Sequence, residues 1–150
     1  MAEYINIFNK NLNFIDTNDQ IGVENTFMYK LENFELFDTL EYEKFLLGFA
    51  ELIFKHSKNN IFDKKLLSNI IHMEYGVSRT YILEQDGVEF LHKGNKYSFD
   101  DFSEILDING LSFVDYSLFS FSFMLQQYCI RNITNFNNIK QYILNKNLLH

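Results

Sequence analysis

The stretch YILEQDGVEFLHKGNKYSFDDFSEIL, residues 81–106, decides the fold class that the sequence predicts. Apolar and polar residues alternate on both sides of Asp86-Gly87, a dipeptide typical of tight hairpins because both central residues of the turn need a positive φ. A second turn signal, Lys93-Gly94-Asn95, follows. The pattern predicts a three-stranded antiparallel meander near residues 79–99. Ser98 and Asp101 then have the spacing of a helix N-cap.

Helical patterns lie on either side of this meander. Asp38 and Glu41 have the spacing of a capping box, and apolar residues then recur every three or four positions, as on the buried face of a helix. Gly76 is interpreted as the stop signal of the next helix. Helices are predicted over residues 40–56, 62–74, 115–132 and 135–145.

Two segments near the N-terminus are ambiguous. Residues 4–8 and 12–16 are short apolar runs around two asparagines, a pattern that predicts a hairpin. Residues 26–37 fit either a strand or a helical face, and their aromatic content favours a strand. The whole sequence predicts one α+β domain over residues 1–150, with about four helices packed on an antiparallel sheet.

Composition limits the cellular location. The apolar fraction of 47% argues against disorder, and no apolar run approaches the roughly 20 residues of a membrane span. The first residues, MAEYINIFNK, lack the basic start of a signal peptide. With Cys129 as the single cysteine, no internal disulfide can form. We therefore expect a cytoplasmic protein.

The charge distribution argues against two classes of partner. The net charge is −7, with all 20 acidic residues and 10 of the 13 basic ones within residues 1–115. Binding to nucleic acid or to an anionic membrane needs clustered Lys or Arg, which this balance disfavours. A cationic protein partner fits, because complementary charge raises association rates and steers orientation.

Catalytic and cofactor signals are weak throughout. No histidine spacing predicts a zinc site, and no glycine-rich nucleotide loop or nucleophile elbow is present, so no cofactor is expected. Cys129 falls late in an apolar segment and is interpreted as a buried structural thiol. Asp100 and Glu104 share a helical face, but acids in a first helical turn are explained by the helix dipole.

Two acidic segments with nearby tyrosines give the predicted partner-binding site. The first segment also contains Asp38 and Glu43, and the second also contains Asp86, Asp100 and Asp101. Whether the two segments share one face is left open by the sequence. The residues assigned to partner binding are Glu32, Glu35, Glu41, Tyr81, Glu84, Glu89, Tyr97, Glu104 and Asp107.

The sequence favours a non-enzymatic acidic binding protein that neutralises a cationic protein. The leading form is an immunity protein that blocks a bacterial nuclease toxin, since the residue usage is typical of an AT-rich genome. An inhibitor encoded by a phage or mobile element has the same features. The competing hypotheses are a small enzyme with His72 or His92 beside a carboxylate, and a subunit of a larger assembly that packs through residues 113–129.

Overall fold

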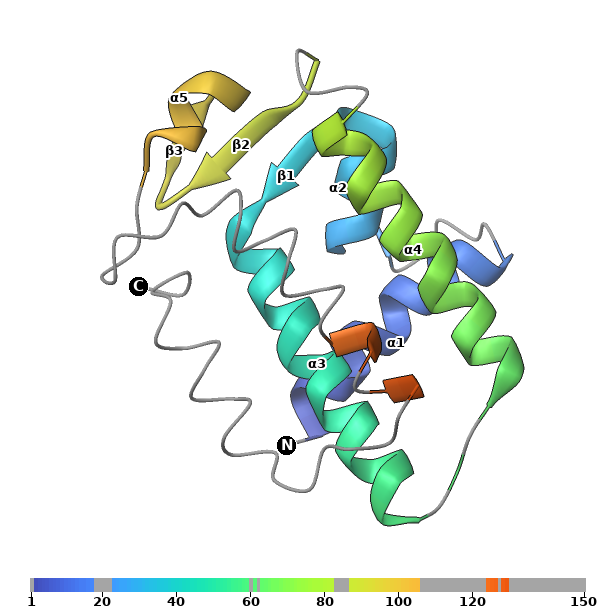
Figure 1. The fold of residues 1–150 in the computed structure, drawn as a ribbon. Coiled ribbons are helices and arrows are strands. Elements are labelled where there is room, and N and C mark those ends of the chain that lie inside the picture. Colours follow the sequence, from blue (N-terminus) through green and yellow to red (C-terminus); the bar gives the residue numbers. More distant parts are fainter. Residues whose placement is uncertain are drawn as a thin grey trace.

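The computed structural model has an α+β fold that is mostly helical, with a small mixed sheet at one end (Figure 1). It describes residues 2–17, 23–59, 61, 63–82, 87–105, 124–126 and 128–129. The described residues form five named helices, three strands and helical turns at 124–126 and 128–129. The α+β prediction is confirmed, whereas the antiparallel sheet and the number of helices were only roughly right.

Helix α3 (Thr39–Lys58) is the centre of the fold and confirms the clearest helical pattern. Its start is capped by Asp38, whose Oδ1 accepts hydrogen bonds from the backbone N–H groups of Leu40 and Glu41 at 3.1 and 3.2 Å. Asp38 Oδ2 also pairs with Lys30 Nζ at 2.8 Å. The predicted apolar stripe is buried and comprises Tyr42, Phe45, Leu46, Phe49, Leu52 and Ile53.

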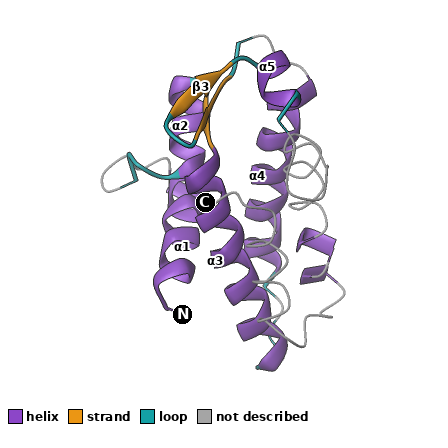
Figure 2. Ribbon diagram, turned by 90° about the vertical axis from the view of Figure 1, so that its left-hand side faces the viewer, coloured by secondary structure: helices purple, strands orange, loops and turns teal. Residues whose placement is uncertain are grey.

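Helix α1 (Ala2–Thr17) replaces the hairpin predicted at residues 4–8 and 12–16. The two apolar runs are successive turns of one helix, and the Phe8 ring stacks on that of Phe49 with centroids 4.9 Å apart. Figure 2 shows α1 and α3 side by side, and the two helices cross at Gly48. The asparagines taken for a turn include Asn11, which is fully buried and hydrogen bonded.

Helix α2 (Phe27–Phe34) corrects the strand that was favoured over residues 26–37. The Thr26 hydroxyl caps it by accepting from the N–H of Tyr29 at 3.3 Å, and the helix buries three apolar side chains. The chain leaves the helix through Glu35, whose φ of 49° reverses its direction, and enters strand β1 (Leu36–Asp38). Helical capping therefore outweighs the β-propensity of the aromatic residues here.

Asn11 joins α1 to the start of α2. Its Oδ1 accepts from the N–H of Met28 at 2.9 Å, and its Nδ2 donates to the carbonyl of Ile7. Because the Met28 bond is buried, Asn11→Ala should lower the free energy of unfolding by about 1–3 kcal/mol. Urea unfolding would measure this. Asn9→Ala, on the exposed side of α1, is the matched control and should change stability by less than about 0.5 kcal/mol.

Helix α4 (Lys64–Ile82) is longer than the helix predicted over residues 62–74 and continues past Gly76. A Cβ at Gly76 would lie 3.1 Å from Glu32 Oε1 and 3.5 Å from Met28 Cε, so this glycine lies where α4 passes close to α2. The first predicted meander strand is therefore wrong, at least as far as Ile82. Asp86 of the predicted first turn lies outside the described residues.

The sheet has the order β1-β2-β3 and contains the second predicted hairpin. Strands β2 (Glu89–His92) and β3 (Asn95–Tyr97) are antiparallel, joined at Lys93 and Gly94, which both have positive φ. Strand β1 pairs with β2 in parallel, so the sheet is mixed. The turn signal at Lys93-Gly94-Asn95 is confirmed, while the all-antiparallel meander is wrong.

Helix α5 (Phe99–Ser103) follows the hairpin and confirms the predicted cap, since Ser98 Oγ accepts from the N–H of Asp101 at 3.2 Å. Phe102 stacks on Phe90 of β2 with ring centroids 4.6 Å apart and planes 7° apart. Of the helix predicted over 115–132, the described parts are helical. The helix predicted over 135–145 lies outside the described residues.

Candidate functional site

The parallel pairing of β1 with β2 brings the two acidic segments together. The backbone N–H of Glu89 donates to the carbonyl of Glu35 at 3.0 Å, and Leu36 is the register partner of Glu89. Both glutamates are exposed. Residues far apart in the sequence are therefore neighbours at one end of the sheet, where β1 and β2 begin, which answers the question that the sequence left open for this pair.

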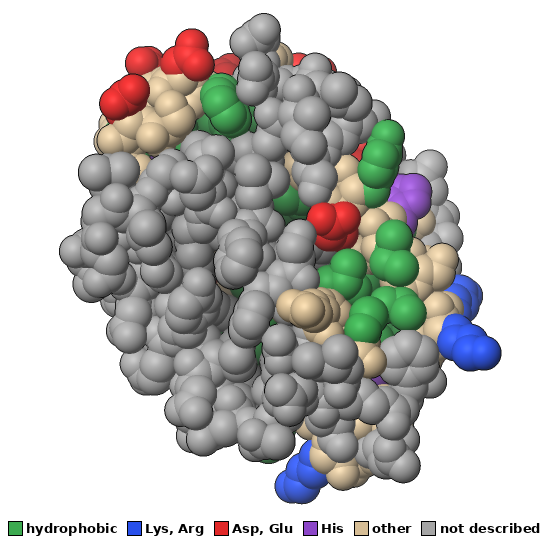
Figure 3. Space-filling model, in the orientation of Figure 1, with side chains coloured by type: hydrophobic (Ala, Val, Ile, Leu, Met, Phe, Trp, Pro, Cys, Tyr) green, Lys and Arg blue, Asp and Glu red, His purple; other side chains and the backbone are tan. Residues whose placement is uncertain are grey.

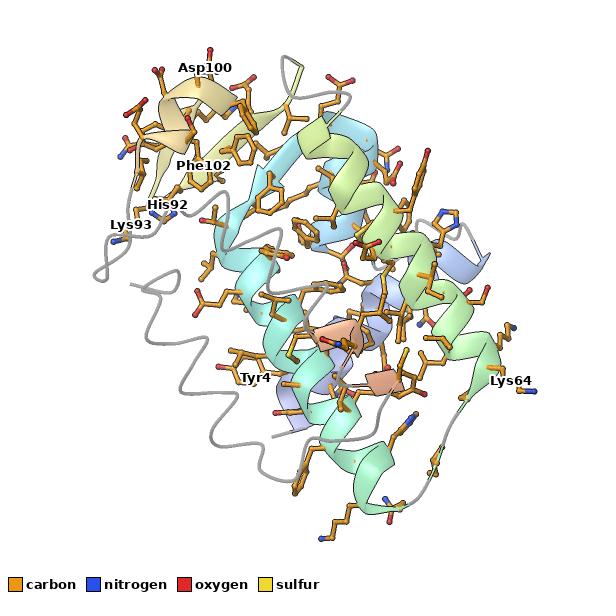
Figure 4. The ribbon with its side chains drawn as sticks, in the orientation of Figure 1. Tyr4, Lys64, His92, Lys93, Asp100 and Phe102 are labelled. Carbon is orange, nitrogen blue, oxygen red and sulfur yellow. The ribbon has the colours of Figure 1, made fainter. Side chains whose placement is uncertain are left out.

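Helix α5 places more carboxylates at the same end of the molecule. Asp100, Asp101 and Glu104 are exposed, while Phe102 holds the helix against the sheet. In Figure 4, Asp100 points outward from α5 and Phe102 points toward β2. Figure 3 shows acidic side chains gathered over α5. We call the set at this end of the fold the acidic end; it comprises Glu35, Glu89, Asp100, Asp101 and Glu104. Glu32 on α2 is also exposed, and its Oε1 lies beside Gly76 of α4.

Other residues of the predicted site have different places. Glu41 is half-buried in the first turn of α3, 3.4 Å from Lys44 Nζ. Tyr97 is half-buried on β3, with its ring centroid 6.4 Å from that of Phe102. Tyr81 belongs to α4, and its side chain is not described; Glu84 and Asp107 lie outside the described residues.

Phe34 is a surface residue that the sequence pattern did not identify. It is the last residue of α2, directly before Glu35, and 64% of its side chain is exposed. Its ring meets the edge of Tyr29, with centroids 5.7 Å apart. Phe34 falls on the inward side in both the strand pattern and the helical pattern of residues 26–37, so neither pattern predicts its exposure. An exposed aromatic residue beside carboxylates is a favourable centre for a protein interface.

Lysines gather at the other end of the molecule. Lys55 and Lys58 lie in the last turn of α3, and Lys64 and Lys65 begin α4. Since α3 has 20 residues, its two ends are about 30 Å apart. Figure 3 shows these opposite regions, with acids at the top and lysines at the lower right and bottom. On the face that Figure 3 shows, carboxylates therefore gather at the sheet end and lysines near the α3–α4 connection.

His92 is one of the two histidines that the enzyme hypothesis places in a catalytic site. Its Nδ1 lies 2.9 Å from the hydroxyl of Thr39, and that hydroxyl donates to the carbonyl of Leu91 at 3.0 Å. Since the Thr39 proton is used there, Nδ1 of His92 is the donor. Burial lowers the pKa of His92, and the Lys93 charge lowers it further. These contacts explain His92 as a structural link between sheet and α3.

The other candidate histidine is His72. His72 is exposed on α4. Within the described ranges, no group of three His, Cys, Asp or Glu side chains is placed to hold a metal ion. The histidine–carboxylate enzyme hypothesis therefore gains no geometric support from His72 or His92.

Glu43 is the most unusual ionisable group in the described part of the chain. It is 0% exposed on α3, and neither carboxyl oxygen has a hydrogen-bond partner there. Burial raises its pKa from 4.5 to about 8. The sequence placed Glu43 among the surface acids of its segment, and this was wrong. Asp38 is also buried and paired with Lys30, so neither acid contributes to the acidic end.

Tyr128 ties the described C-terminal turn to the connection between α3 and α4. Its hydroxyl accepts from the N–H of Asp63 and lies within hydrogen-bond distance of His56 Nδ1, each at 3.2 Å. Burial lowers the pKa of His56, although Asp63 opposes this shift. Because Tyr128 takes the inward position, the next residue, Cys129, is exposed. The expectation of a buried thiol at Cys129 is therefore wrong.

No protein family, curated protein or solved structure that was compared with the chain matches it. None of the helices in the described ranges combines the length and the apolar character needed to cross a membrane. The functional argument therefore depends on the surface chemistry of the chain itself, and the acidic end with Phe34 is its most distinctive feature.

Proposed function

We propose that this chain is a non-enzymatic binding protein that neutralises a cationic protein through its acidic end. The leading form is an immunity protein that blocks a bacterial nuclease toxin. An inhibitor of a host nucleic-acid-acting protein, encoded by a phage or mobile element, would use the same surface. In each case the chain would cover a basic cleft without chemistry of its own.

The observation that carries this proposal is the hydrogen bond of 3.0 Å between Glu89 N–H and the Glu35 carbonyl. It joins two acidic segments and combines them with the carboxylates of α5. A carboxylate cluster of this kind attracts Lys and Arg side chains that otherwise contact phosphates. Lysines on the same hairpin, Lys93 and Lys96, offset only part of this charge.

The separation of carboxylates and lysines on the face in Figure 3 adds orientation to the attraction. An approaching basic cleft is attracted to the sheet end and repelled by the lysines near the α3–α4 connection. Complementary fields of this kind raise association rates and suppress wrong orientations. Phe34 would then supply the apolar contact that slows dissociation, because buried aromatic anchors account for much of the affinity of small interfaces.

The proposal is tested by low-salt capture followed by elution with salt. The chain is immobilised, and a lysate of the source cell is applied at an ionic strength of about 0.01 M. The Debye length is then about 30 Å, so attraction between surface charges is only weakly screened. The expected result is a basic protein that elutes as salt rises and whose nuclease activity the chain inhibits in a purified assay. Recovery of only acidic or neutral proteins, or a captured basic protein that stays fully active, would contradict the proposal.

A charge reversal at Glu89 tests the site itself. Glu89→Lys changes the net charge by two at the centre of the acidic end and should slow association with the captured protein on the order of ten-fold at low salt. Glu24→Lys makes the same change at an exposed position before the N-terminus of α2 and is the matched control. Stopped-flow association rates measure both. Equal slowing in the two variants would show that net charge, and not this surface, governs binding.

A further inference from the structure

The outward side of α4 carries an apolar stripe that is separate from the acidic end. The helix buries Ile70, Met73 and Val77, and it packs against α1. On its other side Ile71 is 50% exposed and Tyr75 is 61% exposed, with half-buried Leu67 one turn earlier. We call Leu67, Ile71 and Tyr75 the apolar stripe. Figure 3 shows hydrophobic side chains gathered on this flank of the molecule, near the lysines.

The residues along this side of α4 have the spacing of a helix–helix seam. Four residues are separated by three, four and three positions in the sequence: Lys64, Leu67, Ile71 and Glu74. These are the steps at which one helix presents side chains to a single neighbouring helix. The seam therefore has an apolar centre, a cation at its N-terminal end and a carboxylate toward its C-terminal end.

This order of charges makes the seam complementary to itself in one orientation. If two copies of α4 lie antiparallel, Lys64 faces Glu74 of the other copy, and Leu67 faces Ile71. Two-fold symmetry repeats each contact, which gives two apolar layers between two layers of opposite charge. A parallel arrangement would instead place Lys64 against Lys64 and Glu74 against Glu74. Charge complementarity therefore selects both the occupant and its direction.

We propose that the outward side of α4 binds α4 of a second copy of this chain in an antiparallel, two-fold symmetric pair. Tyr75 lies beside the seam and extends the apolar contact over the neighbouring helix. The pair leaves the acidic end out of the seam, so it is a property separate from capture of a cationic partner. A contact of a few helical turns is smaller than the roughly 800 Å² per partner of standard stable interfaces. The pair should therefore be reversible and form only at high protein concentration.

Sedimentation equilibrium of the purified full chain over a concentration series tests the pairing. The apparent mass should rise from 17.9 kDa toward twice that value as concentration increases. Ile71→Glu should weaken the association by roughly ten-fold or more, because it buries carboxylates in both apolar layers. Since Ile71 is half exposed, circular dichroism should show an unchanged fold. Even a weak pair, with an association free energy of about −4.1 kcal/mol, would form at about 1 mM protein. A constant monomer mass up to that concentration overturns the proposal.

A charge exchange tests the antiparallel register. Lys64→Glu alone and Glu74→Lys alone should each weaken association roughly three- to ten-fold, because each places like charges across the pair twice. The double variant should restore it. Lys58→Glu, at an exposed position on α3, makes the same charge change outside the seam and should have no such effect. Association that is insensitive to Ile71→Glu, or a double variant that is weaker than both single ones, would overturn this pairing.

Discussion

Replacing Gly48 by alanine is expected to lower the free energy of unfolding by about 3 kcal/mol or more, the upper part of the range for overpacked cores. A Cβ on this residue would overlap the carbonyl oxygen of Tyr4 and lie only 2.7 Å from Phe8 Cβ. The neighbour is helix backbone, which cannot rotate away as the end of a side chain can. Helix α1 would have to move off α3 and open the stacked pair of Phe8 and Phe49.

Urea unfolding measures this loss, and Gly76→Ala is the matched control. It makes the same change inside a helix, but a Cβ there would meet flexible ends of side chains, Glu32 Oε1 and Met28 Cε. The gain in helix propensity, up to about 1 kcal/mol, should offset that crowding. A Gly48→Ala variant as stable as the wild type would show that α1 does not cross α3 as closely as described.

Replacing Glu43 by glutamine is expected to stabilise the protein by about 3 kcal/mol at pH 7. The wild-type carboxyl has its pKa raised by burial from 4.5 to about 8, so the folded state holds a proton that the unfolded state releases. The contribution of Glu43 to stability is therefore greatest below pH 4.5 and falls as the pH rises from 4.5 to 8. Above pH 8 this contribution is constant. Glutamine has nearly the same shape and no charge, so it removes this loss.

The measurement is urea unfolding of both proteins between pH 4 and pH 9. The two should have nearly equal stability at pH 4 and diverge as the pH rises. Glu41→Gln is the control, because Glu41 lies two residues away on the same helix but is partly exposed and beside Lys44. Its effect should stay below about 1 kcal/mol at every pH. A difference between wild type and Glu43→Gln that does not depend on pH would refute the burial of an uncompensated carboxyl.

Local signals made several elements predictable. Asp38 before α3 and Ser98 before α5 accept hydrogen bonds from N–H groups only two or three residues away, so a short stretch of sequence contains both partners. The same holds for Lys93-Gly94, where two positive φ values close the hairpin. Such elements are recognisable because donor, acceptor and backbone preference are neighbours in the chain.

Most of the errors occurred where a deciding partner is distant in the sequence. The start of α2 has a local cap in Thr26, but it also depends on the side chain of Asn11, 17 residues earlier. Helix α1 depends on the close approach that Gly48 allows. The site follows the same rule. Neighbouring Tyr42 and Glu43 are buried while Glu41 is partly exposed, because elements remote in sequence pack on α3. Phe34 is exposed as the last residue of α2, directly before Glu35, a place that the local apolar pattern does not reveal.

The sequence by itself determined an acidic α+β chain, the central helix α3, the β2–β3 hairpin and the capped start of α5, because composition and short-range hydrogen bonding decide these features. The tertiary structure alone decided that β1 pairs with β2 in parallel, and thus that Glu35 and Glu89 are neighbours. It also decided which acids reach solvent. Both depend on non-local packing, whose contacts join residues that no local pattern connects.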